Sequence, residues 1–345
     1  MVLLSIVAAI PVLQLASLGY LLTAGGRLAN GQPWRTCLPG LRVAGKLGVY
    51  GLWGSLLFLP VILIQDLAQS AQILQPNSST AVGWRVGAVI TAMAWLVHIG
   101  WAAMRGGRWW HLLWPAPIKF FADVWRPTTW SKASDQLYDL VVGLQLPKLW
   151  WLGARATIGV LAWLVFPVSM MIIGQRAPAN IAPLIGLLGA GLMTWAMYYL
   201  PFLQMLFVKT GKLSSFLAVG EVRRNYAYAP WAHFLALLIL SAFAIPLYLL
   251  RIEDPPQELM WAPSLIFAIL ILPSKLVIGW AVGYADSRQS RGLKKRGLLI
   301  RWPAHLLGLA PIAFYVGALY VAQLIAKLGA PVMYLQHAFL VPSPF

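Results

Sequence analysis

Residues 181–208 read IAPLIGLLGAGLMTWAMYYLPFLQMLFV, and none of these 28 residues is charged. A helix needs about 20 mainly apolar residues to cross the hydrocarbon core of a bilayer, so this stretch is long enough to span a membrane. Strands of a membrane barrel alternate between apolar and polar residues over roughly ten positions. The stretch does not alternate in this way, and we therefore predict a transmembrane helix here.

The rest of the chain has the same character. Of its 345 residues, 60% are hydrophobic and 10% are charged, whereas soluble domains carry roughly 25% charged residues. So few charged groups cannot cover a water-facing surface. The fold class that we predict is an all-α integral membrane protein, with membrane lipids as its partners and other membrane subunits as further candidates.

Eight segments are long and apolar enough to be spans. They are residues 1–24, 47–64, 86–104, 156–174, 181–208, 231–250, 260–284 and 306–325. No basic leader of the signal-peptide type precedes the first segment, so we expect this segment to be retained in the membrane. A further span upstream of Met1 would reverse the predicted side of the N-terminus.

The basic residues indicate how the spans are oriented. The chain has a net charge of +17, and 21 of its 26 Lys and Arg residues lie in the loops after spans one, three, five and seven. Cytoplasmic loops of membrane proteins collect Lys and Arg. These four loops are therefore predicted to be cytoplasmic and both termini external, in a bacterial inner membrane. The same rule explains the positive charge without a nucleic-acid partner.

The two halves of the chain share short motifs in the same order, which predicts an internal duplication. Each predicted unit has four spans: residues 1–175, with a long cytoplasmic loop at 105–155, and residues 181–345. An even number of spans per unit makes the two repeats parallel. The motif pairs are PVLQ at 11–14 with PFLQ at 201–204, IGWA at 99–102 with IGWA at 278–281, and WPA at 114–116 with WPA at 302–304.

The shared motifs have physical consequences. Pro11 and Pro201 each remove one backbone hydrogen bond and should kink their helices. Gln14 and Gln204 follow one turn later and could bond freed carbonyls or a neighbouring helix. In the WPA motif, the tryptophan fits the headgroup level and the proline fits the start of a helix.

Lys275 is the only charged residue well inside a span, and an intramembrane lysine is a candidate functional residue. The alternative is a side chain that extends to an interface. Pro273 should kink the helix beside it, and Gly279 with Gly283 forms a G-x-x-x-G pattern that permits close helix approach. His98, on span three, precedes the first IGWA motif as Lys275 precedes the second. A lone histidine there is more often structural than a proton carrier.

The third loop contains a segment with helical periodicity. Leu137, Leu140, Val141 and Leu144 recur at helical spacing, and Lys132, Asp135 and Asp139 fall on other faces of the same helix. The pattern predicts an amphipathic helix, which could lie on the cytoplasmic membrane surface or pack under the bundle.

The sequence contains no recognisable catalytic machinery. It has no G-x-x-x-x-G-K-[ST], the phosphate-binding motif of P-loop nucleoside triphosphatases. It also has neither the H-E-x-x-H motif of zinc metalloproteases nor the G-x-S-x-G motif of α/β-hydrolases. Cys37 is the only cysteine, and His111, His233, His305 and His337 are not at metal-ligand spacing. We predict no catalytic residue, no metal site and no cofactor.

Residues Gly19–Leu22 with Gly25–Arg27, followed by Leu59-Pro60, resemble uncharacterised bacterial polytopic membrane proteins of the domain-of-unknown-function type. The resemblance covers mainly the first two spans and implies an inner-membrane location. Three functions remain open. They are a permease-like transporter with a pathway between the repeats, a non-catalytic scaffold or subunit of a larger membrane complex, and a lipid-handling enzyme.

Overall fold

The computed structural model describes residues 12–106, 108–178, 180–249 and 261–326, together with Leu4 and Ala8. Every regular element in these ranges is helical. Part of the first predicted span, including Pro11, lies outside the described residues. So do the loop between predicted spans six and seven, with Glu253, Asp254 and Glu258, as well as His337 and both chain ends.

Seven helical segments in the described ranges are long and apolar enough to cross a membrane, which makes this a multi-pass membrane protein. They correspond to predicted spans two to eight. The described part of the first span is α2 (Gln14–Ala29), with 16 residues, so the count of eight stays a prediction. One of the seven segments runs from Pro127 to Arg176 and contains α8 (Leu146–Arg176). The other six lie in α3 (Leu41–Leu74), α4 (Ser79–Met104), α9 (Ala182–Thr210), α11 (Pro230–Leu249), α12 (Trp261–Ser290) and α13 (Leu298–Ala326).

Local signals determine several helix ends. Ser78 caps α4, because its hydroxyl accepts a hydrogen bond from the backbone N–H of Ala81 at 3.1 Å. Gly211 ends α9 in the left-handed conformation, with φ of 70°, and its N–H bonds the carbonyl of Phe207. Glycine adopts this conformation without a steric penalty.

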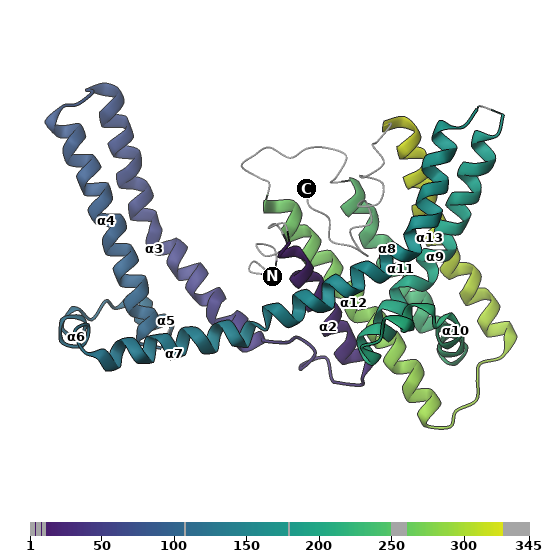
Figure 1. The fold of residues 1–345 in the computed structure, drawn as a ribbon. Helices are drawn as coiled ribbons and strands as arrows, with labels where there is room; N and C mark the ends of the chain where they lie inside the picture. Colours follow the sequence, from purple (N-terminus) through teal and green to yellow (C-terminus); the bar gives the residue numbers. More distant parts are fainter. Residues whose placement is uncertain are drawn as a thin grey trace. The chain divides into compact units, whose positions relative to one another are not determined.

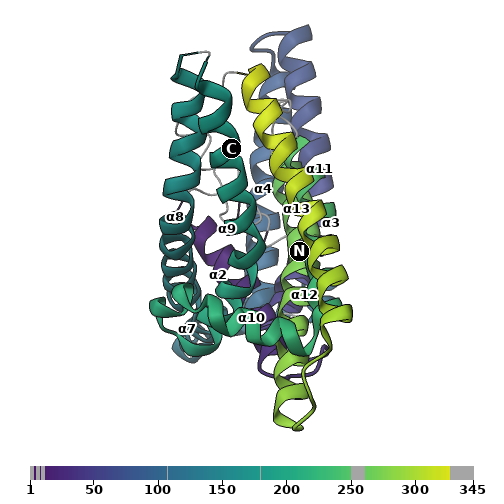
Figure 2. The ribbon, with the colours of Figure 1, turned by 90° about the vertical axis from the view of Figure 1, so that its right-hand side faces the viewer.

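The chain forms two compact units. Unit 1 comprises residues 1–39 and 146–345, and its core is a bundle in which α8 and α9 lie side by side (Figures 1 and 2). Within it, α2 packs against α8, α9 and α12, while α11 packs against α12 and α13. Two short elements, the 3-10 helix η1 (Leu213–Leu217) and α10 (Val219–Tyr228), connect α9 to α11.

Unit 2 comprises residues 40–145. Its main feature is the α3–α4 hairpin (Figure 1). Within the hairpin, the indole N–H of Trp95 donates to the carbonyl of Gly54 at 3.0 Å. Three shorter helices follow at one end of the hairpin: α5 (Trp109–Leu113), α6 (Pro117–Asp123) and α7 (Pro127–Leu144). The predicted amphipathic segment is thus helical, as α7, and it contacts α3 and α4.

These units group the helices differently from the predicted division into residues 1–175 and 181–345. Both α2 and α8, from the first predicted repeat, pack with helices of the second. The reason is that compact units follow side-chain packing, which need not follow chain order. The parallel duplication itself stays a prediction.

The two WPA motifs have different local structures. Trp114, Pro115 and Ala116 connect α5 to α6, and Ala116 has a left-handed backbone with φ of 44°. The second motif lies inside α13, which begins at Leu298, so the expectation that Pro303 begins a helix is wrong. Pro303 is the sixth residue of α13, beyond the four N–H groups that have no partner within a helix, so it leaves the carbonyl of Leu299 without its usual backbone donor.

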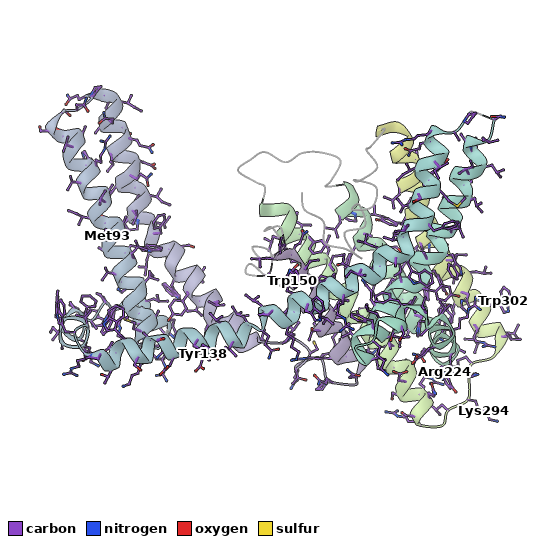
Figure 3. All side chains as sticks on the ribbon, in the orientation of Figure 1. Met93, Tyr138, Trp150, Arg224, Lys294 and Trp302 are labelled. Carbon is purple, nitrogen blue, oxygen red and sulfur yellow. The ribbon has the colours of Figure 1, made fainter. Side chains whose placement is uncertain are left out.

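In unit 1, Arg224 and Lys294 lie at the same end of the bundle, opposite the connection between α8 and α9 (Figure 3). Both residues belong to loops that are predicted to be cytoplasmic. The side of the membrane that this end faces is still a prediction.

Candidate functional site

Two of the predicted site residues meet in the core of unit 1. The amine of Lys275, on α12, donates a hydrogen bond to Oε1 of Gln204, on α9, at 2.6 Å. Neither side chain has any exposed surface. We call these two residues the polar pair. The lysine side chain therefore points into the bundle. The alternative, a side chain that extends to the membrane interface, is excluded.

Both helices carry a proline close to the polar pair. Pro201 is three residues before Gln204, and Pro273 is two residues before Lys275, each inside a helix as predicted. A proline has no N–H, so it leaves the carbonyl four residues earlier without its usual backbone donor. On α12 this carbonyl is that of Ile269, and the hydroxyl of Ser274 donates to the next carbonyl, that of Leu270, at 3.1 Å.

Helix α2 packs against α12 beside the polar pair. A Cβ atom at Gly25 would lie 2.6 Å from the carbonyl oxygen of Lys275, and a Cβ atom at Gly279 would overlap the carbonyl of Gly25. A Cβ atom at Gly283 would in turn meet the carbonyl of Leu28. The two helices thus touch backbone to backbone, as the G-x-x-x-G pattern predicts, and this contact fixes the position of Lys275.

A second polar contact joins the same two helices. Lys209, on α9, forms an ion pair with Asp286, on α12, and both side chains are partly exposed. Lys209 follows Gln204 by five residues, and Asp286 follows Lys275 by eleven. Asp286 lies on α12, and not in the loop after it, because the helix continues to Ser290.

The other two predicted residues lie elsewhere. Gln14 begins α2, eleven residues before Gly25, which is about 16 Å along a helix. Its Oε1 is buried and has no hydrogen-bond partner among the described residues. His98 belongs to unit 2, where its Nε2 lies 2.5 Å from the carbonyl oxygen of Leu112 and joins α4 to α5. Neither residue contributes to the polar pair.

Unit 1 also contains an aromatic cluster that the sequence did not reveal. It consists of Tyr198 on α9, Tyr226 on α10, His233 on α11 and His305 on α13. The hydroxyl of Tyr198 lies 2.7 Å from Nδ1 of His305, and the rings of Tyr226 and His305 stack with centroids 3.7 Å apart. Its members come from four helices, so no local sequence pattern could have identified them.

Within this cluster, His233 is completely buried. One ring nitrogen, Nδ1, bonds the carbonyl of Ala229 at 2.9 Å, while Nε2 has no hydrogen-bond partner in the described part of the chain. Burial raises the pKa of Tyr226 to about 12, so that hydroxyl stays protonated at neutral pH. The described residues contain no group of three potential metal ligands.

Comparison of the chain with protein families, with curated proteins and with solved structures found no match. The function of this membrane protein has therefore to be inferred from its own geometry.

Proposed function

We propose that this multi-pass membrane protein is permease-like, and that its α9–α12 contact opens during transport. The observation that carries the proposal is the hydrogen bond between Lys275 and Gln204 in the interior of a bundle whose core is otherwise mostly apolar.

The energetic cost of Lys275 supports a functional role. Placing a lysine at the centre of a membrane helix costs about 2.5 to 3.5 kcal/mol on insertion scales. Apolar residues of similar volume often give a core that is at least as stable as one with buried polar or charged pairs. The amine is therefore a costly way to hold two helices together, whereas it could bind a negatively charged solute once α9 and α12 separate.

The surroundings of the polar pair allow such a separation. Each helix has a proline within one turn of its polar residue, and prolines are common sites of bending in helices. The Lys209–Asp286 ion pair would break in the same movement, since it joins the same two helices. In the predicted duplication, α2 belongs to the first repeat and α9 and α12 to the second, so a pathway beside α2 would lie between repeats.

Currents in proteoliposomes would test this proposal. The full chain is reconstituted on a solid-supported membrane and challenged with gradients of chloride, phosphate, acetate and glutamate. The unmodified protein and a Lys212→Met control, in which an exposed lysine is replaced, should give a current with at least one anion. Lys275→Met should give none while it remains monodisperse and helical. The proposal would be contradicted if the folded unmodified protein gave no current with any of the anions, or if Lys275→Met gave an undiminished current.

A second candidate function, a non-catalytic subunit of a membrane complex, is favoured by the α3–α4 hairpin. Many of its large apolar side chains are exposed, including Leu52, Ile90 and Met93. Figure 3 labels Met93 on α4. A photo-reactive amino acid at Met93, with Leu187 on α9 as the comparison site, would distinguish lipid from protein neighbours in native membranes. A protein adduct specific to Met93 supports the subunit function, and lipid adducts at both sites argue against it.

A further inference from the structure

We infer that the end of unit 2 binds the phosphate group of an anionic phospholipid. The site is a cavity of about 620 Å³ where the start of α3, the end of α4 and α5 meet. We call it the basic cavity. The residues of its lining that matter to the argument are Lys46, Arg105, Arg108, Trp109, Trp110 and His111.

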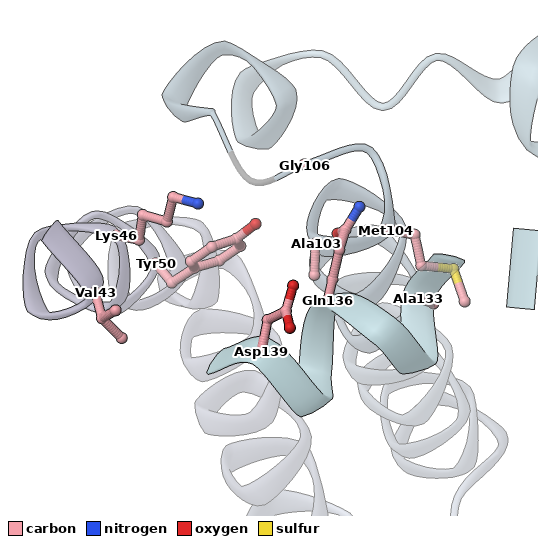
Figure 4. A pocket seen from close by; sticks show the side chains of 9 residues that line it. All are labelled: Val43, Lys46, Tyr50, Ala103, Met104, Gly106, Ala133, Gln136 and Asp139. Atoms are coloured by element: carbon pink, nitrogen blue, oxygen red, sulfur yellow. The ribbon is translucent and has the colours of Figure 1, made fainter. Parts of the chain in front are cut away.

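The charge of the lining selects an anion. Three cationic side chains contribute to it, and none of the described residues that line it is acidic. The ion pairs in the described part of the chain do not involve Lys46, Arg105 or Arg108. Two adjoining cavities have an acid in their lining. Asp139 lines one of about 570 Å³ that shares Lys46 and Gly106 with the basic cavity (Figure 4), and Asp123 lines one of about 700 Å³ that shares Arg105 and His111.

Arg105 is held in place by the loop that follows it. Its Nη2 donates to the carbonyl oxygens of His111 and Trp114, each at 2.6 Å. Its Nε is buried and has no hydrogen-bond partner among the described residues, and the same holds for Nδ1 of His111. A buried donor without an acceptor is unfavourable, and a phosphate oxygen in the cavity would provide that acceptor.

The electrostatic environment of His111 also favours an anion in the basic cavity. Burial, and after it the nearby Arg105, Arg108 and Lys119, lowers the pKa of His111. The positive charges of these three side chains thus act at His111 in addition to burial.

The apolar surroundings identify the anion as a lipid. The guanidinium of Arg108 lies over the ring of Trp110, 5.2 Å from its centroid, and Trp109 stacks on Trp53 of α3. In the same unit, Ile118 on α6 is 87% exposed and Trp125, which follows α6, is 83% exposed. Tryptophan prefers the headgroup level of a membrane, and basic pockets beside transmembrane helices bind anionic headgroups. The acyl chains would then lie along the exposed apolar side chains of α3 and α4.

Native mass spectrometry of the delipidated full chain in detergent would test the site. Phosphatidylglycerol, phosphatidylcholine and inorganic phosphate are added separately. The unmodified protein should bind phosphatidylglycerol in preference to phosphatidylcholine, and millimolar phosphate should not displace it. Lys46→Gln/Arg108→Gln should lose about 30-fold in affinity for phosphatidylglycerol, since each cation near the surface contributes about a factor of five.

Arg85→Gln is the matched control. It removes one exposed cation at the opposite end of α4 and should leave the preference unchanged. The single variants Lys46→Gln and Arg108→Gln, each weaker by about fivefold, replace the double variant if the latter does not fold. Equal binding of the two lipids by the unmodified protein, an unchanged preference in the folded variants, or displacement by phosphate would each overturn the inference.

Discussion

The amine of Lys275 donates a hydrogen bond to Oε1 of Gln204 across 2.6 Å, although the two residues are 71 positions apart in the chain. Both side chains are completely buried, so water cannot replace either partner. A buried donor that loses its acceptor costs about 1–3 kcal/mol. The two residues are therefore expected to depend on each other, and this dependence can be measured.

We expect Gln204→Leu to destabilise the bundle by about 1–3 kcal/mol, because it leaves the Lys275 amine without this acceptor. Lys275→Met combined with Gln204→Leu should cost less than the sum of the two single changes, by roughly 0.5–3 kcal/mol. Thermal unfolding of the four proteins in one detergent measures this coupling. Strict additivity would show that the two side chains do not interact.

The contact between α2 and α12 should not tolerate a methyl group. Gly279→Ala is expected to destabilise the protein by about 1–3 kcal/mol, as overpacking does, because the new Cβ would overlap the carbonyl of Gly25. Gly191→Ala, on α9, is the control, since nothing lies within 4 Å of its Cβ position. It should be neutral or stabilising by up to about 1 kcal/mol. Equal losses in the two variants would mean that the helices do not touch at Gly279.

The Lys209–Asp286 ion pair should matter more for opening than for folding. Partly exposed pairs contribute about 0.2–1 kcal/mol, so Asp286→Asn should lower stability only slightly. If the α9–α12 contact opens during transport, the same change should increase anion currents by up to about fivefold, the factor that corresponds to 1 kcal/mol. The exchanged pair Lys209→Asp/Asp286→Lys should restore the original current. Failure of the exchange to do so would argue against a role for the pair.

The Tyr198–His305 contact should stabilise the aromatic cluster. Tyr198→Phe removes the hydroxyl that lies 2.7 Å from His305 Nδ1. We expect this change to lower the free energy of unfolding by about 0.5–1.5 kcal/mol. Tyr284→Phe is the comparison variant: its ring stacks on Trp280 and its side chain is exposed. Tyr284→Phe should change the free energy of unfolding by no more than about 0.5 kcal/mol. Thermal unfolding that gives equal values for the two variants would contradict a structural role for the hydrogen bond.

The predicted orientation can be tested with an impermeant thiol reagent in intact cells, in a Cys37→Ala background. A cysteine at Ser79, which is exposed and leaves the Ser78 cap intact, should be labelled. A cysteine at Lys294 should be labelled only after permeabilisation, because its loop is one of the four basic loops. Labelling of Lys294→Cys alone in intact cells would reverse the topology.

The sequence by itself determined the local properties of this protein. Hydropathy is a sum over about 20 neighbouring residues, so the sequence located seven membrane-spanning helices without tertiary information. It also identified Lys275 as an unusual intramembrane charge, placed Pro201 and Pro273 inside helices, and indicated close packing at Gly279. Each of these conclusions depends on residues that are near one another in the chain.

Only the tertiary structure decided which groups meet. The partner of Lys275, the four members of the aromatic cluster and the grouping of α2 and α8 with later helices depend on the rotation and height of each helix relative to its neighbours. Contacts such as that between Gly25 and Gly279 set this register. Because these contacts join residues far apart in the chain, and many apolar faces could pack in several ways, hydrophobic periodicity cannot specify them.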